Sequence, residues 1–201
     1  MLIAVEGIDG SGKTTIVRHL VEELRKRGYD VVAFKEPTDS EYGKMIRQIL
    51  KDRKVSPEEE LKLFIKDREF NVRNNILPAL KDGKVVIMDR YYYSTMAYQG
   101  ALGLDVERIK MLNKQFPKPD LVIILDVSPE TALKRIKAKR KPDRFEDVEY
   151  LRRVREIFLS LKNNVVVVDA ERDIEEVKRD VLKIVLEFLG KSFKGERRMK
   201  V

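Results

Sequence analysis

Five short runs of apolar, mostly β-branched residues recur along the chain: Leu2–Val5, Val31–Phe34, Val85–Met88, Leu121–Leu125 and Val165–Val168. The runs are nearly continuous rather than alternating, which is typical of strands that are covered on both faces of a parallel sheet. Between them, apolar residues recur at helical spacing over residues 16–24, 57–80, 106–116, 129–138, 148–161 and 174–189. Strands that alternate with helices predict an α/β fold, namely a three-layer sandwich around a five-stranded parallel sheet.

Nothing in the 201 residues divides the chain. There is no internal repeat and no Gly/Ser-rich linker, so we expect a single domain spanning residues 1–201. Residues 137–147 form the most polar internal segment and are rich in Lys and Arg. Residues 190–201 form a basic tail without clear periodicity, which we expect to fray.

Charge and composition narrow the function class only in part. The net charge is +8, and 38% of residues are charged with both signs interspersed, which favours a solvated, ion-paired surface. The basic excess suits an anionic small ligand as well as nucleic acid. The absence of cysteine excludes disulfides, zinc ribbons and thiol catalysis. The apolar start of the chain is too short for a signal peptide, so we expect a soluble, cytoplasmic protein without a membrane partner.

A phosphate-binding motif follows the first strand directly. It has the pattern G-x-x-x-x-G-K-[ST] between a strand and a helix, which is the context expected of a P-loop. We expect its residues to bind ATP: Gly7, Ile8, Asp9, Gly10, Ser11, Gly12, Lys13 and Thr14. Lys13 would reach the β- and γ-phosphates, and the Thr14 hydroxyl would ligate Mg²⁺. A carboxylate inside a phosphate cradle would repel phosphate, so Asp9 is either a simple turn residue or points away toward another substrate.

A second pair of candidate residues ends the third strand. Asp89 lies where a Walker-B carboxylate holds Mg²⁺, at the sheet edge where α/β folds place ligands. Arg90 could clamp a second phosphate through its guanidinium, although a surface arginine is the simpler alternative. Phe64 and Arg68 share a helix face, as stacking on a nucleobase and donation to its carbonyls would require. Without further evidence, a Phe at helical spacing is more often a core residue than a contact to a base. A structural role is likewise the more common one for Arg47.

The chain resembles the thymidylate kinase family of P-loop nucleoside-monophosphate kinases. Six ordered segments carry the resemblance: VEGIDGSGKTT (5–15), KEPTDSEYGKMIR (35–47), LFIKDR (63–68), DRYYYSTMAYQG (89–100), KPDLVIILDVSPETALKR (118–135) and DRFED (143–147). The resemblance implies a kinase that transfers a phosphoryl group from MgATP to dTMP, giving ADP and dTDP. It also implies a homodimer, because the family forms one.

The resemblance assigns roles to residues of the second site. Asp9 would hold the 3′-hydroxyl of dTMP, while Arg47 and Arg90 would grip its phosphate. Phe64 would stack on thymine and Arg68 would donate to a thymine carbonyl. The sugar and base would be further contacted by residues of the fourth segment: Tyr98 would crowd the 2′ position, and Thr95 and Gln99 would lie beside the base.

Two departures from the family pattern matter. Position 10 is glycine, where one branch of the family carries a catalytic arginine. Segment 137–147 would then be a lid that supplies this cation from Arg140 or Arg144, so the expected catalytic cations are Lys13, Arg90 and one of these two. Lys35 stands where bacterial members have arginine, so no phosphate role is assigned to it.

Three other classes of function are compatible with parts of the sequence. A kinase of the same architecture could act on another pyrimidine monophosphate or on a deoxynucleoside. A P-loop ATPase or switch could act on a protein partner, but the Asn-Lys-x-Asp base reader of GTP switches is missing, since Asn113-Lys114 is followed by Gln115-Phe116. A nucleic-acid binder would need an aromatic and basic platform, which the sequence lacks, so no nucleic-acid partner is expected.

Overall fold

The computed structural model describes residues 1–52, 55–138 and 147–198. Its sheet contains five strands in the order β2-β3-β1-β4-β5, and every neighbouring pair is parallel. The strands are β1 (Leu2–Glu6), β2 (Val31–Lys35), β3 (Val85–Asp89), β4 (Leu121–Asp126) and β5 (Val165–Asp169). The predicted α/β class and the five-stranded parallel sheet are therefore confirmed.

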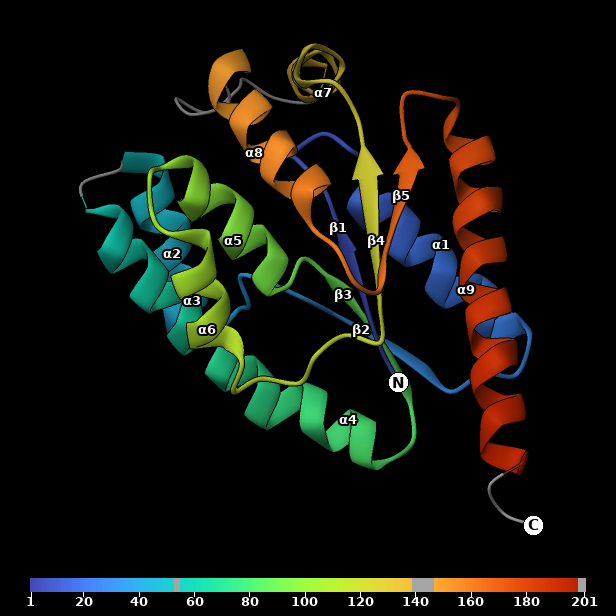
Figure 1. Ribbon diagram of the computed structural model, residues 1–201. Coiled ribbons are helices and arrows are strands. Elements are labelled where there is room, and N and C mark those ends of the chain that lie inside the picture. Colours follow the sequence, from blue (N-terminus) through green and yellow to red (C-terminus); the bar gives the residue numbers. More distant parts are fainter. Residues whose placement is uncertain (53–54, 139–146, 199–201) are drawn as a thin grey trace.

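Helices cover both faces of the sheet (Figure 1). Helices α1 (Lys13–Lys26) and α9 (Ile174–Arg198) pack together on one face. The opposite side carries α2 (Glu41–Asp52), α3 (Pro57–Asn71), α4 (Leu77–Lys81), α5 (Tyr92–Ala101), α6 (Val106–Asn113) and α8 (Val148–Ser160). Helix α7 (Pro129–Lys137) lies next to α8, beyond the carboxyl end of β4. These layers give the three-layer sandwich that the sequence predicts.

The strand register brings the candidate site residues to one edge of the sheet. Asp89 pairs with Val5 on β1 and with Lys35 on β2. The P-loop, the segment after β2 and Arg90 therefore all leave the sheet at the same level. This edge is the carboxyl end of a parallel sheet, where α/β proteins bind their ligands.

Three helices differ from the expectation. The segment predicted as one helix over 57–80 consists of α3, a π-helical turn at Val72–Ile76 and α4. The sequence pattern did not predict α5, because none of its residues is fully exposed and its apolar residues form no distinct stripe. The sequence pattern predicted the last helix only to residue 189, and α9 continues to Arg198.

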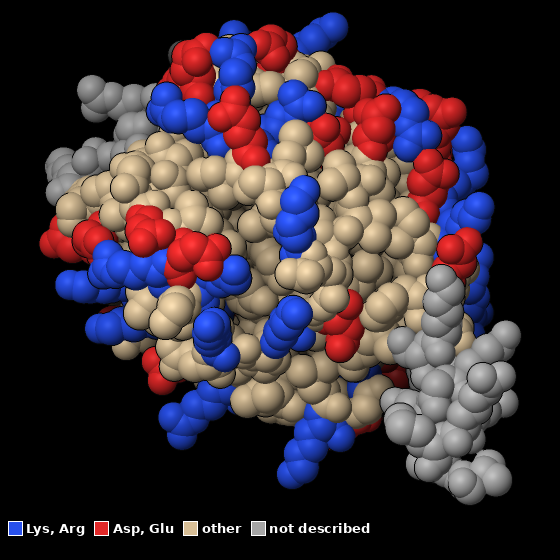
Figure 2. Space-filling view, in the orientation of Figure 1, with Lys and Arg blue, Asp and Glu red and all other residues tan. Residues whose placement is uncertain are grey.

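The surface carries charges of both signs. Figure 2 shows Lys and Arg interspersed with Asp and Glu around the rim of one face, while the area between them is mostly uncharged with a few isolated charges. Within the described ranges, none of the helices has the length and apolar character that crossing a bilayer requires.

Candidate active site

The loop from Gly7 to Gly12 has a backbone that favours glycine. Gly7, Gly10 and Gly12 adopt φ values of 137°, 83° and 95°. A Cβ at Gly7 would lie 2.5 Å from the carbonyl oxygen of Leu125, so a larger residue would also clash there. Helix α1 begins directly after Gly12 and has no side-chain cap. Its first N–H groups are therefore available to an anion, as in other P-loops.

Lys13 lies inside this loop and is only 6% exposed. Its ammonium group donates to the carbonyl oxygens of Gly7 (3.0 Å) and Ile8 (2.7 Å), and to Ser11 Oγ (3.3 Å). Burial lowers the pKa of Lys13 to about 7, and the positive charge of Arg90 is the second cause of this shift. A phosphate at the loop would favour the charged form of Lys13, because an opposite charge nearby raises the pKa of an amine.

Thr14 and Asp89 bring two oxygen donors together beside the loop. Thr14 Oγ1 donates to Asp89 Oδ2 at 2.6 Å. Hard oxygen donors of this kind suit Mg²⁺, which in kinases is held by one or two protein groups together with substrate phosphates and water. Among the described residues, no three His, Cys, Asp or Glu side chains form a metal site of their own. The donor set therefore fits an ion that arrives with a nucleotide.

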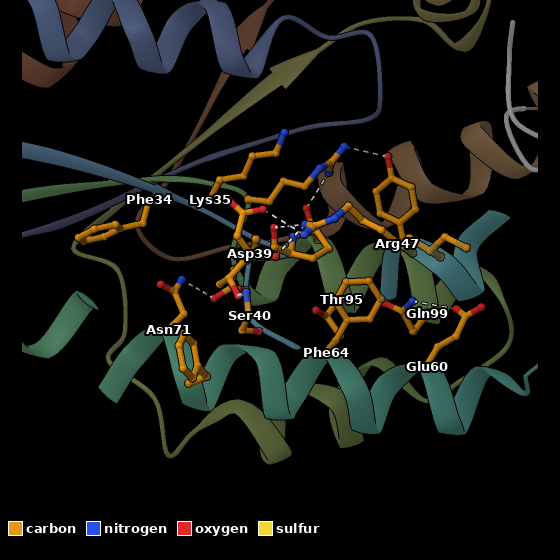
Figure 3. Close-up of a pocket in the computed structure, with 18 of the residues that line it drawn as sticks. Phe34, Lys35, Asp39, Ser40, Arg47, Glu60, Phe64, Asn71, Thr95 and Gln99 are labelled. Atoms are coloured by element: carbon orange, nitrogen blue, oxygen red, sulfur yellow. Dashed lines mark hydrogen bonds and ion pairs between the residues drawn. The ribbon is translucent and has the colours of Figure 1, made fainter. Parts of the chain in front are cut away.

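A cavity of about 920 Å³ opens next to the loop. It lies between β2, the segment that follows β2, and helices α2, α3 and α5 (Figure 3). In this view Phe64 and Glu60 rise from α3 toward Thr95 and Gln99 of α5. Seven of the eight residues expected to bind dTMP line the cavity: Asp9, Arg47, Phe64, Arg90, Thr95, Tyr98 and Gln99.

Asp9, Arg90 and Tyr98 form a compact cluster at the cavity wall nearest the P-loop. Arg90 donates from NH2 to Asp9 Oδ1 at 2.6 Å, and the Tyr98 hydroxyl donates to Asp9 Oδ2 at 3.1 Å. Burial alone would raise the pKa of Asp9, but Arg90 and Lys13 lower it below its usual range. The carboxylate thus faces Arg90 and the cavity instead of the phosphate loop.

Arg47 reaches the cavity from α2. Its guanidinium donates to the carbonyl oxygens of Pro37 (3.2 Å) and Thr38 (2.7 Å), and to Asp39 Oδ1 (3.0 Å). The segment that carries these acceptors is held by the buried carboxylate of Asp67, which accepts hydrogen bonds from Thr38 and from Ser40. Arg47 is therefore oriented by backbone carbonyls at one end of the cavity.

Arg68 is placed differently from what the resemblance implies. Its side chain is 0% exposed and does not line the cavity. The guanidinium donates to Glu36 Oε2 (2.9 and 2.7 Å), Asn113 Oδ1 (2.7 Å) and Thr95 Oγ1 (2.9 Å). In this arrangement Arg68 supports Thr95 from behind, and direct donation to a thymine carbonyl would require these bonds to rearrange.

Two acidic residues of the site were missed by sequence reasoning. Glu36 and Glu60 are buried and line the cavity. Glu60 Oε2 accepts from Gln99 Nε2 at 3.3 Å, and the buried Gln99 Oε1 has no hydrogen-bond partner among the described residues. Glu60 belongs to an acidic run at the start of α3, where a solvated helix end is the usual reading. Only the packing of α3 against α5 distinguishes it from Glu58 and Glu59.

Arg140 and Arg144 lie outside the described residues, as does most of the segment expected to form a lid. Only residues 137–138 and 147 of that segment are described.

Comparison with known proteins decides the family. A sequence model of the family described as thymidylate kinase matches residues 5–181. The chain belongs to the thymidylate kinase family. A probable thymidylate kinase of Archaeoglobus fulgidus is 52% identical over 192 residues, covering 94% of this chain and 97% of the relative.

Other thymidylate kinase relatives match over a similar length. A probable thymidylate kinase of Pyrococcus horikoshii is 44% identical, covering 94% of this chain and 97% of the relative. A thymidylate kinase of Xylella fastidiosa is 43% identical, covering 94% and 92%. The match therefore includes both the P-loop and the cavity.

Proposed function

We propose that this chain transfers the terminal phosphoryl group of ATP to the phosphate of dTMP, giving ADP and dTDP. The observation that carries the proposal is the position of the Arg90 cluster, between the P-loop and the 920 Å³ cavity. Arg90 also donates to the Gly7 carbonyl oxygen at 3.2 Å, so one guanidinium joins the two sites. A kinase needs such a bridge because the donor and acceptor phosphates must meet.

The residues act mainly by positioning and by charge. A phosphate oxygen of dTMP is ionised at neutral pH, so the reaction needs no general base to create the nucleophile. Lys13 and Arg90 spread positive charge over the transferring group, which is where phosphoryl transfer accumulates negative charge. Arg47 grips the acceptor phosphate, and Asp9 accepts a hydrogen bond from the 3′-hydroxyl of the sugar.

The base is held by residues at the other end of the cavity. Phe64 offers an aromatic face for stacking. Thr95 and Gln99 lie beside the base; Arg68 supports Thr95 and Glu60 supports Gln99, each through a hydrogen bond. A P-loop ATPase acting on a protein partner would have no use for a cavity of about 920 Å³ lined by Phe64, Thr95 and Gln99.

Thr14 and Asp89 would hold Mg²⁺ together with the phosphates of ATP. The ion, when bound, neutralises charge on the β- and γ-phosphate oxygens. The protein's part is to keep the Thr14 hydroxyl and the Asp89 carboxylate directed at the loop. We place the reaction in the cytoplasm, where both nucleotides are available.

A further cation belongs to the same proposal, and we assign it to Arg140 or Arg144. The P-loop itself does not accommodate an arginine at position 10. A Cβ there would lie 2.5 Å from the carbonyl oxygen of Ala132, and the φ of 83° is unfavourable for any side chain. A third positive charge at the transferring phosphoryl group would therefore come from outside the P-loop.

The sugar preference provides a specific test. Tyr98 packs beside Asp9 and would leave no room for a 2′-hydroxyl. Tyr98→Ala should raise kcat/KM for ribo-TMP relative to dTMP by about tenfold. Tyr98→Phe is the matched control, because it keeps the ring and loses only the hydroxyl group with its hydrogen bonds to Asp9 and Arg90; it should keep the preference for deoxyribose. An unchanged ratio in Tyr98→Ala would show that another residue excludes the 2′-hydroxyl.

We also propose that the protein is a homodimer that pairs through α3 and α6. The Arg108–Glu58 ion pair (2.5 Å) joins these helices, and they expose Met111 (62%) and Phe70 (41%) to solvent. Light scattering should give the mass of a dimer for the unmodified chain and of a monomer for Met111→Glu. Val167→Glu, on the exposed edge of β5, is the control that should remain dimeric. A monomeric unmodified chain would contradict the proposal.

A further inference from the structure

A buried carboxylate lies next to the phosphate loop without taking part in the mechanism above. Glu6 is the last residue of β1 and is 0% exposed. Its Oε1 accepts from the backbone N–H groups of Tyr91 (2.8 Å) and Ser94 (3.3 Å), and its Oε2 accepts from Ser94 Oγ (2.6 Å). One bond runs to the segment that joins β3 to α5, which carries Arg90, and the other two run to the first turn of α5.

Glu6 caps α5 from a neighbouring strand. Tyr91 is the N-cap residue of α5, and its own side chain makes no capping bond. The carboxylate of Glu6 takes over this function by accepting from the N–H of Tyr91 and by sharing the N–H of Ser94, which also donates to the Tyr91 carbonyl oxygen at 3.0 Å. A negative charge at this position is also favoured by the helix dipole. The start of α5 is therefore fixed relative to β1.

The same contacts hold the strained backbone of Arg90. Arg90 has a φ of 72°, in the left-handed region that residues with a side chain seldom adopt. Its N–H donates to the carbonyl oxygen of Val5 at 3.1 Å, and the next N–H, of Tyr91, donates to Glu6. Two adjacent residues of β1 thus clamp the turn on both sides of the Arg90 Cα.

Glu6 also acts on the guanidinium through one hydroxyl group. Ser94 Oγ accepts from Arg90 NH1 at 2.8 Å and donates its single hydrogen to Glu6. Because a serine hydroxyl has one hydrogen and two lone pairs, this donation leaves a lone pair directed at Arg90. Burial raises the pKa of Glu6 to about 7, while Ser94, Arg90, Tyr91 and Lys13 oppose that rise.

We propose that Glu6 is a positioning residue that sets the direction of the Arg90 guanidinium, both through the clamped turn and through Ser94. The proposal rests on the proposed function of Arg90 as a ligand of the dTMP phosphate. It makes Glu6 a determinant of acceptor binding, although its side chain touches neither nucleotide.

The test compares dTMP binding in two backgrounds by isothermal titration calorimetry. In Glu6→Gln, the amide would donate to Ser94 Oγ and compete with Arg90 for its lone pairs. The Kd for dTMP should rise about tenfold, while the KM for ATP changes less than about twofold. In an Arg90→Ala background, the same Glu6 substitution should change the Kd for dTMP by less than about twofold, because the group through which it acts is gone.

Two controls separate positioning from general destabilisation. Asp105 caps α6 by accepting from the N–H groups of Glu107 and Arg108, and Asp105→Ala should lower the melting temperature without changing the Kd for dTMP. Ser94→Ala removes the relay and keeps the carboxylate. It should weaken dTMP binding in the same direction, and it serves as the test variant if Glu6→Gln does not fold.

Three results would overturn the role proposed for Glu6, and one of them would also overturn the role of Arg90. An unchanged Kd in Glu6→Gln or, where that variant does not fold, in Ser94→Ala would overturn the proposed role of Glu6. So would an equal loss from Glu6→Gln in the native and Arg90→Ala backgrounds. Unweakened dTMP binding by Arg90→Ala alone would overturn the function assigned to Arg90, and the proposal for Glu6 with it.

Discussion

Lys13→Ala is expected to reduce kcat for phosphoryl transfer by about 10²–10³-fold, the usual effect of removing one preorganised charge from a transition state. Lys13 is the cation enclosed by the P-loop, within hydrogen-bond distance of the Gly7 and Ile8 carbonyl oxygens. It lies at the ATP side of the Arg90 cluster, so the Kd for dTMP should stay within about threefold of the unmodified value.

The measurement is steady-state ADP release with saturating dTMP, together with dTMP titration in the absence of ATP. Lys84→Ala is the matched control: Lys84 lies at the opposite, amino end of the sheet, where it pairs with Asp30 at 3.8 Å. This variant should have unchanged kinetics. More than about a tenth of the original kcat remaining in Lys13→Ala would contradict the assignment of the phosphate loop.

Asp89→Asn should lower kcat by about 10²-fold and should raise the Mg²⁺ concentration needed for half-maximal activity. Asparagine keeps the shape of the side chain and can still accept the Thr14 hydrogen bond. It loses the negative charge, which strengthens the binding of a hard divalent cation to an oxygen ligand. The expected loss is therefore one of metal binding, with the fold retained.

Varying MgCl₂ at fixed ATP measures this effect, and circular dichroism checks the fold. Asp120→Asn is the control, because Asp120 also neighbours the central strands but accepts from Leu2 N at their amino ends (2.8 Å). Its Mg²⁺ dependence should match that of the unmodified chain. An unaltered Mg²⁺ dependence in Asp89→Asn would contradict the metal site.

The features that could be predicted from the sequence are those with local signals. Each strand is a short apolar run, and the P-loop is a fixed spacing of Gly, Lys and Thr, so both were located from a few residues. Once the strands are parallel, Asp89 and Arg90 must reach the same edge as the loop. The P-loop and the neighbouring carboxylate of Asp89 could therefore be predicted from the sequence.

The features that were missed depend on contacts between distant segments. Helix α5 has no apolar stripe because several elements cover it, so its periodicity carries no signal. Arg68 stands in a motif that implies a base contact, but only packing shows its bonds to Glu36 and Asn113. Glu6 reads as the last residue of a strand, and its link to Ser94 spans 88 positions.

One coupled assay of ADP release from MgATP with a panel of acceptors tests directly whether dTMP is the phosphoryl acceptor. The panel contains dTMP, dUMP, dCMP, ribo-TMP, UMP, CMP and thymidine, with a reaction lacking any acceptor as the blank. We expect the highest kcat/KM for dTMP, reduced activity with ribo-TMP and little ADP release in the blank. Equal or higher kcat/KM with another acceptor, or ADP release that does not depend on an acceptor, would contradict it.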